Sequence, residues 1–347
     1  MRKILLAVLL LWMLAIPTSA LELTAPEVPA SGQKVMPRNT EEFGAGLLEL
    51  TQAGAQLLQT ELKDAGDLCG KILISGVLFT LIPVFSRKLV GFVPLAGCVS
   101  IASILLQNTG AMISFASDCL WELCEYGKLL CPVMTAALAA QGGIGSSSLL
   151  YLGTTVFISF LSMLVSRMMI PMVYLYLLFS VTHCALGEEF LKKLADTVKS
   201  TLIWLLKTLI VVFTTYMGIT GVVSGTTDAA ALKAAKITIS SVVPVIGGIL
   251  SDASESVLVS MGLVKNAAGV YGILAAAAVF LGPFLRLGVR YLLLKVTGAL
   301  CSLFAEKQIT VLVEQFAGAM GLLLAMVATG CIMVLISTVC FMKGMSG

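Results

Sequence analysis

Long stretches without a charged side chain constrain this chain more than any other feature of its sequence. A helix of about 20 apolar residues crosses the hydrocarbon core of a bilayer, and most of these stretches reach that length. Because a backbone in lipid must satisfy its own hydrogen bonds, we predict an all-α fold, a polytopic integral membrane helix bundle with about six to eight spans. The uncharged stretches are residues 72–86, 89–117, 129–166, 168–187, 208–227, 237–251, 266–285 and 315–342.

The composition excludes several large classes of protein. Charged residues make up 12% of the chain and hydrophobic residues 58%, whereas soluble domains carry roughly 25% charged residues. The formal net charge is +3, so the chain has no basic field that would hold nucleic acid. A disordered chain needs low hydrophobicity and high net charge, which is the opposite pattern. We therefore expect the lipid bilayer, and no nucleic acid, among the partners.

Two of the uncharged stretches are short and contain residues that interrupt helices. Pro83 lies in residues 72–86, whereas Pro244 and a following glycine pair lie in residues 237–251. Short interrupted apolar segments are typical of broken or re-entrant helices, whose free backbone groups need protein or water around them. We predict that the bundle contains such helices.

The residues between the uncharged stretches predict how the spans are connected. The acidic residues within 118–125 are expected in an external loop. Residues 129–166 are too long for one span and contain a glycine- and serine-rich run at 142–148, which predicts two helices joined by a tight turn. In residues 188–207 apolar side chains recur at helical spacing with lysines on the other face, which predicts an interfacial helix that leads into a span.

The amino terminus has the three parts of a secretory signal peptide. Two basic residues precede an apolar run at 4–16, and small residues follow as far as Ala20. The apolar run is shorter than a membrane span requires. We therefore predict a cleaved signal peptide at 1–20 and a mature chain that begins outside the cell membrane.

The mature chain divides into an external region and a membrane domain. Residues 21–40 are rich in proline and predict an extended tether, and the remainder of 21–68 predicts an amphipathic helix. The apolar stripe of this helix fits a membrane surface, a partner helix or a lid on the protein's own bundle, and the sequence leaves these open. Residues 69–347 form the predicted polytopic membrane domain.

Two parts of the membrane domain resemble each other. Residues 176–182 are similar to residues 291–297, and a second short match has nearly the same offset. These matches predict diverged repeats at 129–218 and 241–333, with coincidence between leucine-rich segments as the alternative. Membrane assemblies built from repeats place their functional pathway at the interface between the copies.

The sequence offers no strong catalytic or metal-binding motif. His183 is the single histidine, and metal sites need several ligands at suitable spacing. We therefore predict no metal, no cofactor and no enzymatic activity. The sharpest enzymatic alternative is an intramembrane hydrolase that pairs Ser146 with His183. The cysteines lie mostly within apolar runs, where they behave as small hydrophobic side chains. Cys119, Cys124 and Cys131 near the predicted external loop are the alternative candidates for one disulfide.

The candidate functional residues are the ionisable residues that lie within or beside the apolar stretches, together with the proline and glycines of the interrupted stretch 237–251. Burying a charge in lipid costs about 2.5 to 3.5 kcal/mol unless the charge is paired or hydrated. The functional interpretation is a polar cavity or a docking face, and the alternative is simple contact with lipid headgroups. The candidate pore or assembly residues are Asp228, Lys233, Lys236, Pro244, Gly247, Gly248, Asp252, Glu255, Lys265, Arg286 and Arg290.

Residues around these candidates resemble a known family. The runs are Ser-Gly-Thr-Thr-Asp at 224–228, Val-Pro-Val-Ile-Gly-Gly at 243–248 and Val-Lys-Asn-Ala at 264–267. Together with the signal peptide, the amphipathic segment and the polytopic remainder, they are similar to the stage III sporulation protein AE family. The resemblance covers nearly the whole chain, although this chain is shorter toward its amino end.

The resemblance implies a non-enzymatic subunit of the channel, or feeding tube, that joins mother cell and forespore and supports forespore development after engulfment. The implied partners are the other stage III sporulation A proteins and, through the complex, stage II sporulation protein Q. The implied location is the mother-cell-derived outer forespore membrane. The resemblance implies no catalytic residues in this sequence. The alternative functions are an autonomous transporter or channel for small solutes, and a homo-oligomer is an alternative form of assembly.

Overall fold

The computed structural model describes residues 27–37, 43–85, 93–140, 144–242 and 247–343, without the side chains of 221–269 and of some residues at helix ends. The described part of the chain is helical apart from short turns. Its elements are α2 (Ala30–Gln33), α3 (Phe43–Phe85), α4 (Val93–Ala140), α5 (Ile144–Leu164), the π-helix η2 (Val165–Met169), α6 (Ile170–Leu186), α7 (Glu189–Val242), α8 (Gly247–Cys301) and α9 (Lys307–Lys343).

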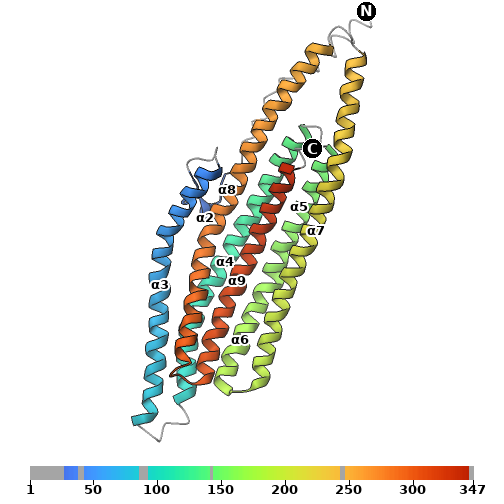
Figure 1. The fold of residues 1–347 in the computed structure, drawn as a ribbon. Helices are drawn as coiled ribbons and strands as arrows, with labels where there is room; N and C mark the ends of the chain where they lie inside the picture. Colours follow the sequence, from blue (N-terminus) through green and yellow to red (C-terminus); the bar gives the residue numbers. More distant parts are fainter. Residues whose placement is uncertain (1–26, 38–42, 86–92, 141–143, 243–246, 344–347) are drawn as a thin grey trace, which may run out of the picture.

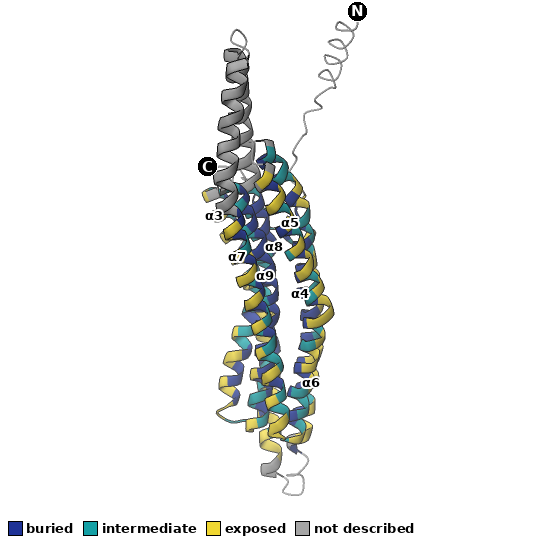
Figure 2. Ribbon diagram, turned by 90° about the vertical axis from the view of Figure 1, so that its right-hand side faces the viewer, coloured by how far each residue is buried: buried dark blue, intermediate teal, exposed yellow. Residues whose placement is uncertain are grey.

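The long helices lie side by side as an elongated bundle (Figure 1). Helix α9 is the central element and contacts α4, α5, α6, α7 and α8. Of its most apolar segment 61% is buried, against 28% for α3. Figure 2 shows the buried residues concentrated along α8 and α9, with exposed residues on the outer faces of the surrounding helices.

Six helices among the described residues are long and apolar enough to cross a membrane. This finding confirms the prediction of an all-α membrane helix bundle and agrees with the lower end of the predicted number of spans. The predicted signal peptide at 1–20 lies outside the described residues. The spans are Gly44–Ile82, Leu95–Ala139, Ser147–Leu186, Glu189–Thr220, Val270–Cys301 and Lys307–Met342.

Two segments that the sequence predicts to interrupt helices lie within continuous helices instead. The first short uncharged stretch is the end of α3, so it is not a separate broken helix before Phe85. The acidic residues of 118–125 lie inside α4 and do not form a loop. Lys128 pairs with Glu125 at 2.8 Å one turn away, and such pairs stabilise a helix across a charged stretch. The predicted external loop at 118–125 was therefore wrong, because these charged residues lie within a continuous helix.

The other predicted connections agree with the structure. Helix α4 ends at Ala140 and α5 begins at Ile144, so the long stretch 129–166 does contribute to two helices. Helix α7 runs without interruption from Glu189 through the predicted interfacial segment and into a span. The predicted repeats at 129–218 and 241–333 remain a prediction.

The turn between α6 and α7 is fixed by Gly187 and His183. Gly187 has a φ of 73°, a left-handed conformation that glycine adopts without the strain of a Cβ. Its N–H donates to the carbonyl of His183 at 2.8 Å. The Nδ1 atom of His183 lies 2.9 Å from the carbonyl oxygen of Glu188. The single histidine therefore closes a helix end.

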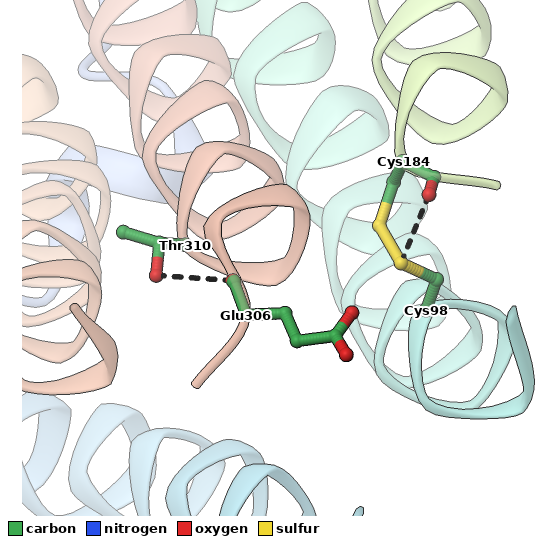
Figure 3. The surroundings of a disulfide bond; sticks show 4 residues. All are labelled: Cys98, Cys184, Glu306 and Thr310. Carbon is green, nitrogen blue, oxygen red and sulfur yellow. Dashed lines mark hydrogen bonds between the residues drawn. A yellow bond between two sulfur atoms is a disulfide. The ribbon is translucent and has the colours of Figure 1, made fainter. Parts of the chain in front are cut away.

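A disulfide joins α4 to α6 near this turn (Figure 3). It links Cys98 and Cys184, whose Cα atoms are 6.0 Å apart. Cys119, Cys124 and Cys131, the alternative candidates for a disulfide, are instead buried as free thiols in α4. Since α4 is continuous there, these cysteines lie on a helix and not in the loop that would have let them meet.

Candidate functional site: two polar clusters inside the bundle

The first polar cluster joins α3 to α8, and we call Glu61, Phe115, Arg286 and Arg290 the arginine cluster. Arg290 donates from Nη1 to Glu61 Oε2 at 2.9 Å. Its side chain is only 6% exposed, and that of Glu61 is 18% exposed. An ion pair this far from water has little screening. Arg290 and Glu61 therefore act as a buried clamp between the two helices.

Arg286 completes the arginine cluster from one turn away on α8. Its Nε lies 3.8 Å from Glu61 Oε1, and its guanidinium carbon lies 4.4 Å from the centre of the Phe115 ring on α4. A cation over an aromatic face is attracted by the electron density of the ring. Arg286 is also 37% exposed at its side chain. It therefore holds the cluster less tightly than Arg290 does, and it brings in a third helix.

The sequence predicts Arg286, Arg290 and Lys295 near one face of a helix, without a partner for them. The two arginines do meet at Glu61, whereas Lys295 is exposed on the other side of α8, so that part of the prediction was wrong. Glu61 belongs to the segment that was predicted to form a separate external region, so it was not considered as a partner. The signal was its place within the amphipathic helix, since an acid beside an apolar stripe faces whatever that stripe covers.

The remaining candidates from the sequence are only partly covered by the structure. Pro244 lies outside the described residues. The others lie on α7 or α8, and their side chains are not described, so their role as pore or assembly residues stays a prediction. These residues are Asp228, Lys233, Lys236, Gly247, Gly248, Asp252, Glu255 and Lys265.

Helix α3 covers the protein's own bundle, which agrees with one of the three interpretations of its apolar stripe. Leu50 packs on Leu274 and Ala278 of α8. At the other end, the hydroxyl of Thr80, which donates to the carbonyl of Gly76 at 2.7 Å, lies 3.3 Å from the carbonyl oxygen of Phe304. The arginine cluster lies between these two contacts on α3. The outward side of α3 remains apolar and exposed, at Leu47, Leu48, Leu58 and Leu62.

The segment before α3 is also held against the bundle. Val28 is buried, and the position of a Cβ on Gly32 would lie 2.8 Å from the side chain of Val279 on α8. The N–H of Ser31 donates to Glu122 Oε2 of α4 at 3.1 Å. Residues 27–37 therefore dock on α4 and α8 through backbone and apolar contacts.

The second polar cluster lies between α6, α7 and α9, and we call Tyr176, Lys199, Gln315 and Gly318 the lysine cluster. The hydroxyl of Tyr176 donates to the carbonyl of Gln315 at 2.8 Å. A Cβ built on Gly318 would lie 2.9 Å from the Tyr176 hydroxyl and 3.0 Å from Lys199 Nζ. Without a side chain at position 318 both groups approach α9 closely, whereas a Cβ there would push the hydroxyl or the ammonium group away.

The two clusters differ in how their polar groups are satisfied. In the arginine cluster the carboxylate of Glu61 contacts both cations, although the Nε atoms of Arg286 and Arg290 are buried without a hydrogen-bond partner. In the lysine cluster Lys199 forms no ion pair with any described residue, and both amide atoms of Gln315 are buried without a hydrogen-bond partner. Buried polar groups are nearly always hydrogen-bonded. The lysine cluster therefore has donor capacity that the described side chains do not use.

The structure contradicts the hydrolase alternative. Ser146 lies in the first turn of α5, whereas His183 lies at the end of α6. The run from α5 through η2 to α6 is helical throughout, which places the two residues about 55 Å apart along the axis at 1.5 Å per residue. A nucleophile and its base must be within hydrogen-bond reach. Within the described part of the chain, no three His, Cys, Asp or Glu residues gather as metal ligands would.

Comparisons with known proteins agree with the resemblance in the sequence. The family model for stage III sporulation protein AE matches residues 34–344. The stage III sporulation protein AE of Bacillus subtilis (strain 168) is 22% identical over 170 residues, which cover 49% of this chain and 43% of that relative. The chain thus matches less than half the length of the curated relative. No solved structure matches this chain.

Proposed function

We propose, because the chain belongs to the stage III sporulation protein AE family, that it serves sporulation as a non-enzymatic membrane subunit of the channel between mother cell and forespore. The family match over residues 34–344 is the observation that carries this proposal. In this role the protein lies in the outer forespore membrane and supports forespore development after engulfment.

The fold supports a role in assembly. Its centre is a packed apolar core around α9, and among the described residues the two polar clusters are contacts between helices. Helix α3 is fixed on the bundle by the arginine cluster and leaves an apolar outer face. A rigid bundle of this kind can present fixed surfaces to other membrane proteins. We propose that the partners are the other stage III sporulation A proteins and, through them, stage II sporulation protein Q.

A second candidate function is an autonomous transporter or channel for small solutes. The unsatisfied lysine cluster favours it, because ionisable residues within membrane helices commonly mark pathways for solutes or ions. Flux of a solute through liposomes that contain this protein alone would favour the transporter. Absence of flux under every imposed gradient would count against it.

The test of the proposed subunit is a pull-down of the tagged full chain from sporulating cells in mild detergent. Recovery of the other stage III sporulation A proteins is the expected result. Recovery of a homo-oligomer without them would overturn the proposal and favour the transporter.

Matched variants make this pull-down specific to the central charges. The charge reversals Asp252→Lys and Glu255→Lys are expected to reduce recovery of the partners and the number of heat-resistant spores. The reversal Glu27→Lys is the control, because Glu27 is an exposed residue before α2. Equal tolerance of all three changes would show that the central charges only contact headgroups.

A further inference from the structure

The lysine cluster combines three features that favour the binding of a polar ligand. The first is the buried amide of Gln315, a residue only 6% exposed, with both of its polar atoms unpartnered. Each such atom that stays unsatisfied in an interior destabilises the fold by its full loss of hydration. Native structures explain most groups of this kind by a water or an ion that holds them.

The second feature is the ammonium group of Lys199. Lys199 is half-buried on α7 and has no ion pair with any described residue. Since Tyr176 Oη and Lys199 Nζ both lie within 3.0 Å of one point beside Gly318, the hydroxyl and the ammonium group are neighbours. Gln315 precedes Gly318 by three residues on α9, and residues at this spacing lie on adjoining parts of one helix face.

The third feature is depth. Lys199 lies about ten residues after the start of α7 and Gln315 about eight after the start of α9, so both are roughly 12 to 15 Å inside the bundle. Lys199 is half-buried there, and the exposed Asp196 one turn earlier on α7 forms no ion pair with it, so the ammonium group gives up hydration without a described counterion. An acceptor with negative charge would offset that cost and use the free donors of the Gln315 amide.

We propose that the lysine cluster binds an oxyanion of the phosphate class, held by Lys199 Nζ and the amide of Gln315. Charge-assisted hydrogen bonds from an ammonium group and an amide to a phosphate oxygen are short and strong. Tyr176 positions the site, because its hydroxyl is already used on the Gln315 carbonyl and fixes α6 against α9. The phosphate can come from an anionic phospholipid headgroup between the helices or from a free ion.

The test uses the purified full chain in neutral detergent with two probes. Binding of phosphatidylglycerol is measured by native mass spectrometry, and binding of inorganic phosphate is measured by titration calorimetry. We expect the wild type to bind one of the probes and Lys199→Gln to bind it about tenfold more weakly or less. Lys193→Gln is the matched control, since Lys193 is an exposed lysine on the same helix, and it should bind as the wild type does. Binding of the lipid identifies a headgroup site, and binding of phosphate identifies a site for the free ion.

A second variant distinguishes an occupied site from an empty one. Gln315→Leu removes both unpartnered atoms at similar volume. In an empty site this change relieves the fold and raises the midpoint of thermal unfolding, which would overturn the proposal. In an occupied site the change removes a contact to the bound group, so the midpoint falls by several degrees in the presence of the probe. Equal binding of both probes by the wild type and Lys199→Gln, including no binding by either, would also overturn it.

Discussion

The arginine cluster and the lysine cluster both place cationic side chains among polar groups of the bundle. Among the described residues, the cations of the first cluster have a counterion and the cation of the second has none. Glu61 contacts two cations at 2.9 and 3.8 Å, and one of these cations is also stacked on a ring. Lys199 and the amide of Gln315 have no such partner among the described residues. In the first cluster the contacts join α3, α4 and α8 and only the Nε atoms of the two arginines lack a hydrogen-bond partner, whereas in the second the ammonium group of Lys199 has no described counterion at all.

The difference indicates different roles. A charge that has its counterion within the chain stabilises the native arrangement and offers less to a ligand than a charge without one. A donor that remains unpaired inside the same bundle has a use only when something else accepts from it. We therefore expect substitutions in the arginine cluster to affect folding first, and substitutions in the lysine cluster to affect binding first.

The largest effect is expected from breaking the buried pair on one side. Arg290→Met leaves the carboxylate of Glu61 buried with only the distant Nε of Arg286, and unpaired buried charges of this kind cost about 3 to 5 kcal/mol. The free energy of unfolding of the purified protein, measured by denaturant titration in detergent, should fall by this amount.

Two further variants test the cause of that loss. Glu61→Leu combined with Arg290→Met removes both charges, and the double variant should recover most of the stability, because an apolar pair can replace a buried ion pair. Lys295→Met on the exposed side of the same helix should change little. A double variant no more stable than Arg290→Met alone would show that the pair does not act as a unit.

The sequence predicted one side of this cluster and not the other. Arg286 and Arg290 share a helix, so the spacing of four residues was enough to place them on one face. Glu61 comes from a distant helix, and no local pattern shows which helix α3 will cover. The same limit applies to Gln315, which lies at the start of an uncharged stretch and was interpreted as part of a span.

The disulfide marks a second kind of contact that the sequence could not assign. Nine cysteines allow many pairings, and nearness along the chain favoured Cys119, Cys124 and Cys131. The structure joins Cys98 to Cys184 across 86 residues, because the chain returns to its starting end through α4, α5 and α6. The antiparallel order of the helices, not local spacing, brings these two sulfurs together.

Loss of the disulfide is expected to have the second largest effect. Cys98→Ser with Cys184→Ser removes a crosslink that closes a long loop, which corresponds to about 2 to 4 kcal/mol. The thermal unfolding midpoint of the double variant should fall. The midpoint of the wild type should fall to a similar value in a reducing agent, while the double variant should not respond to the reagent. A wild type that is insensitive to reduction would contradict a stabilising disulfide.

A methyl group beside Gly318 tests the close approach of α6 and α7 to α9 at the lysine cluster. Gly318→Ala places a methyl group 2.9 Å from the Tyr176 hydroxyl and 3.0 Å from Lys199 Nζ, and overpacking of this kind costs about 1 to 3 kcal/mol. Gly110→Ala on α4 is the matched control, because a Cβ there meets no atom within 4 Å beyond its own helix and no proline directly follows it. It should gain slightly in stability from the helix preference of alanine. Calorimetric unfolding of the two variants measures the difference, and equal midpoints would contradict the close approach at Gly318.

The smallest effect is expected at the exposed edge of the arginine cluster. Arg286→Met removes the longer contact to Glu61 and the stacking on Phe115 but leaves the 2.9 Å pair of Glu61 with Arg290 intact. Because the Arg286 side chain is 37% exposed, water screens much of its interaction, and we expect a loss of about 1 kcal/mol. The measurement is the same denaturant titration, repeated with Phe115→Leu, which should remove the stacking part alone. If Arg286→Met lowered the free energy of unfolding as much as Arg290→Met does, the two arginines would contribute equally to pairing with Glu61. The deeper burial of Arg290 would then not explain why its contact with Glu61 is the stronger one.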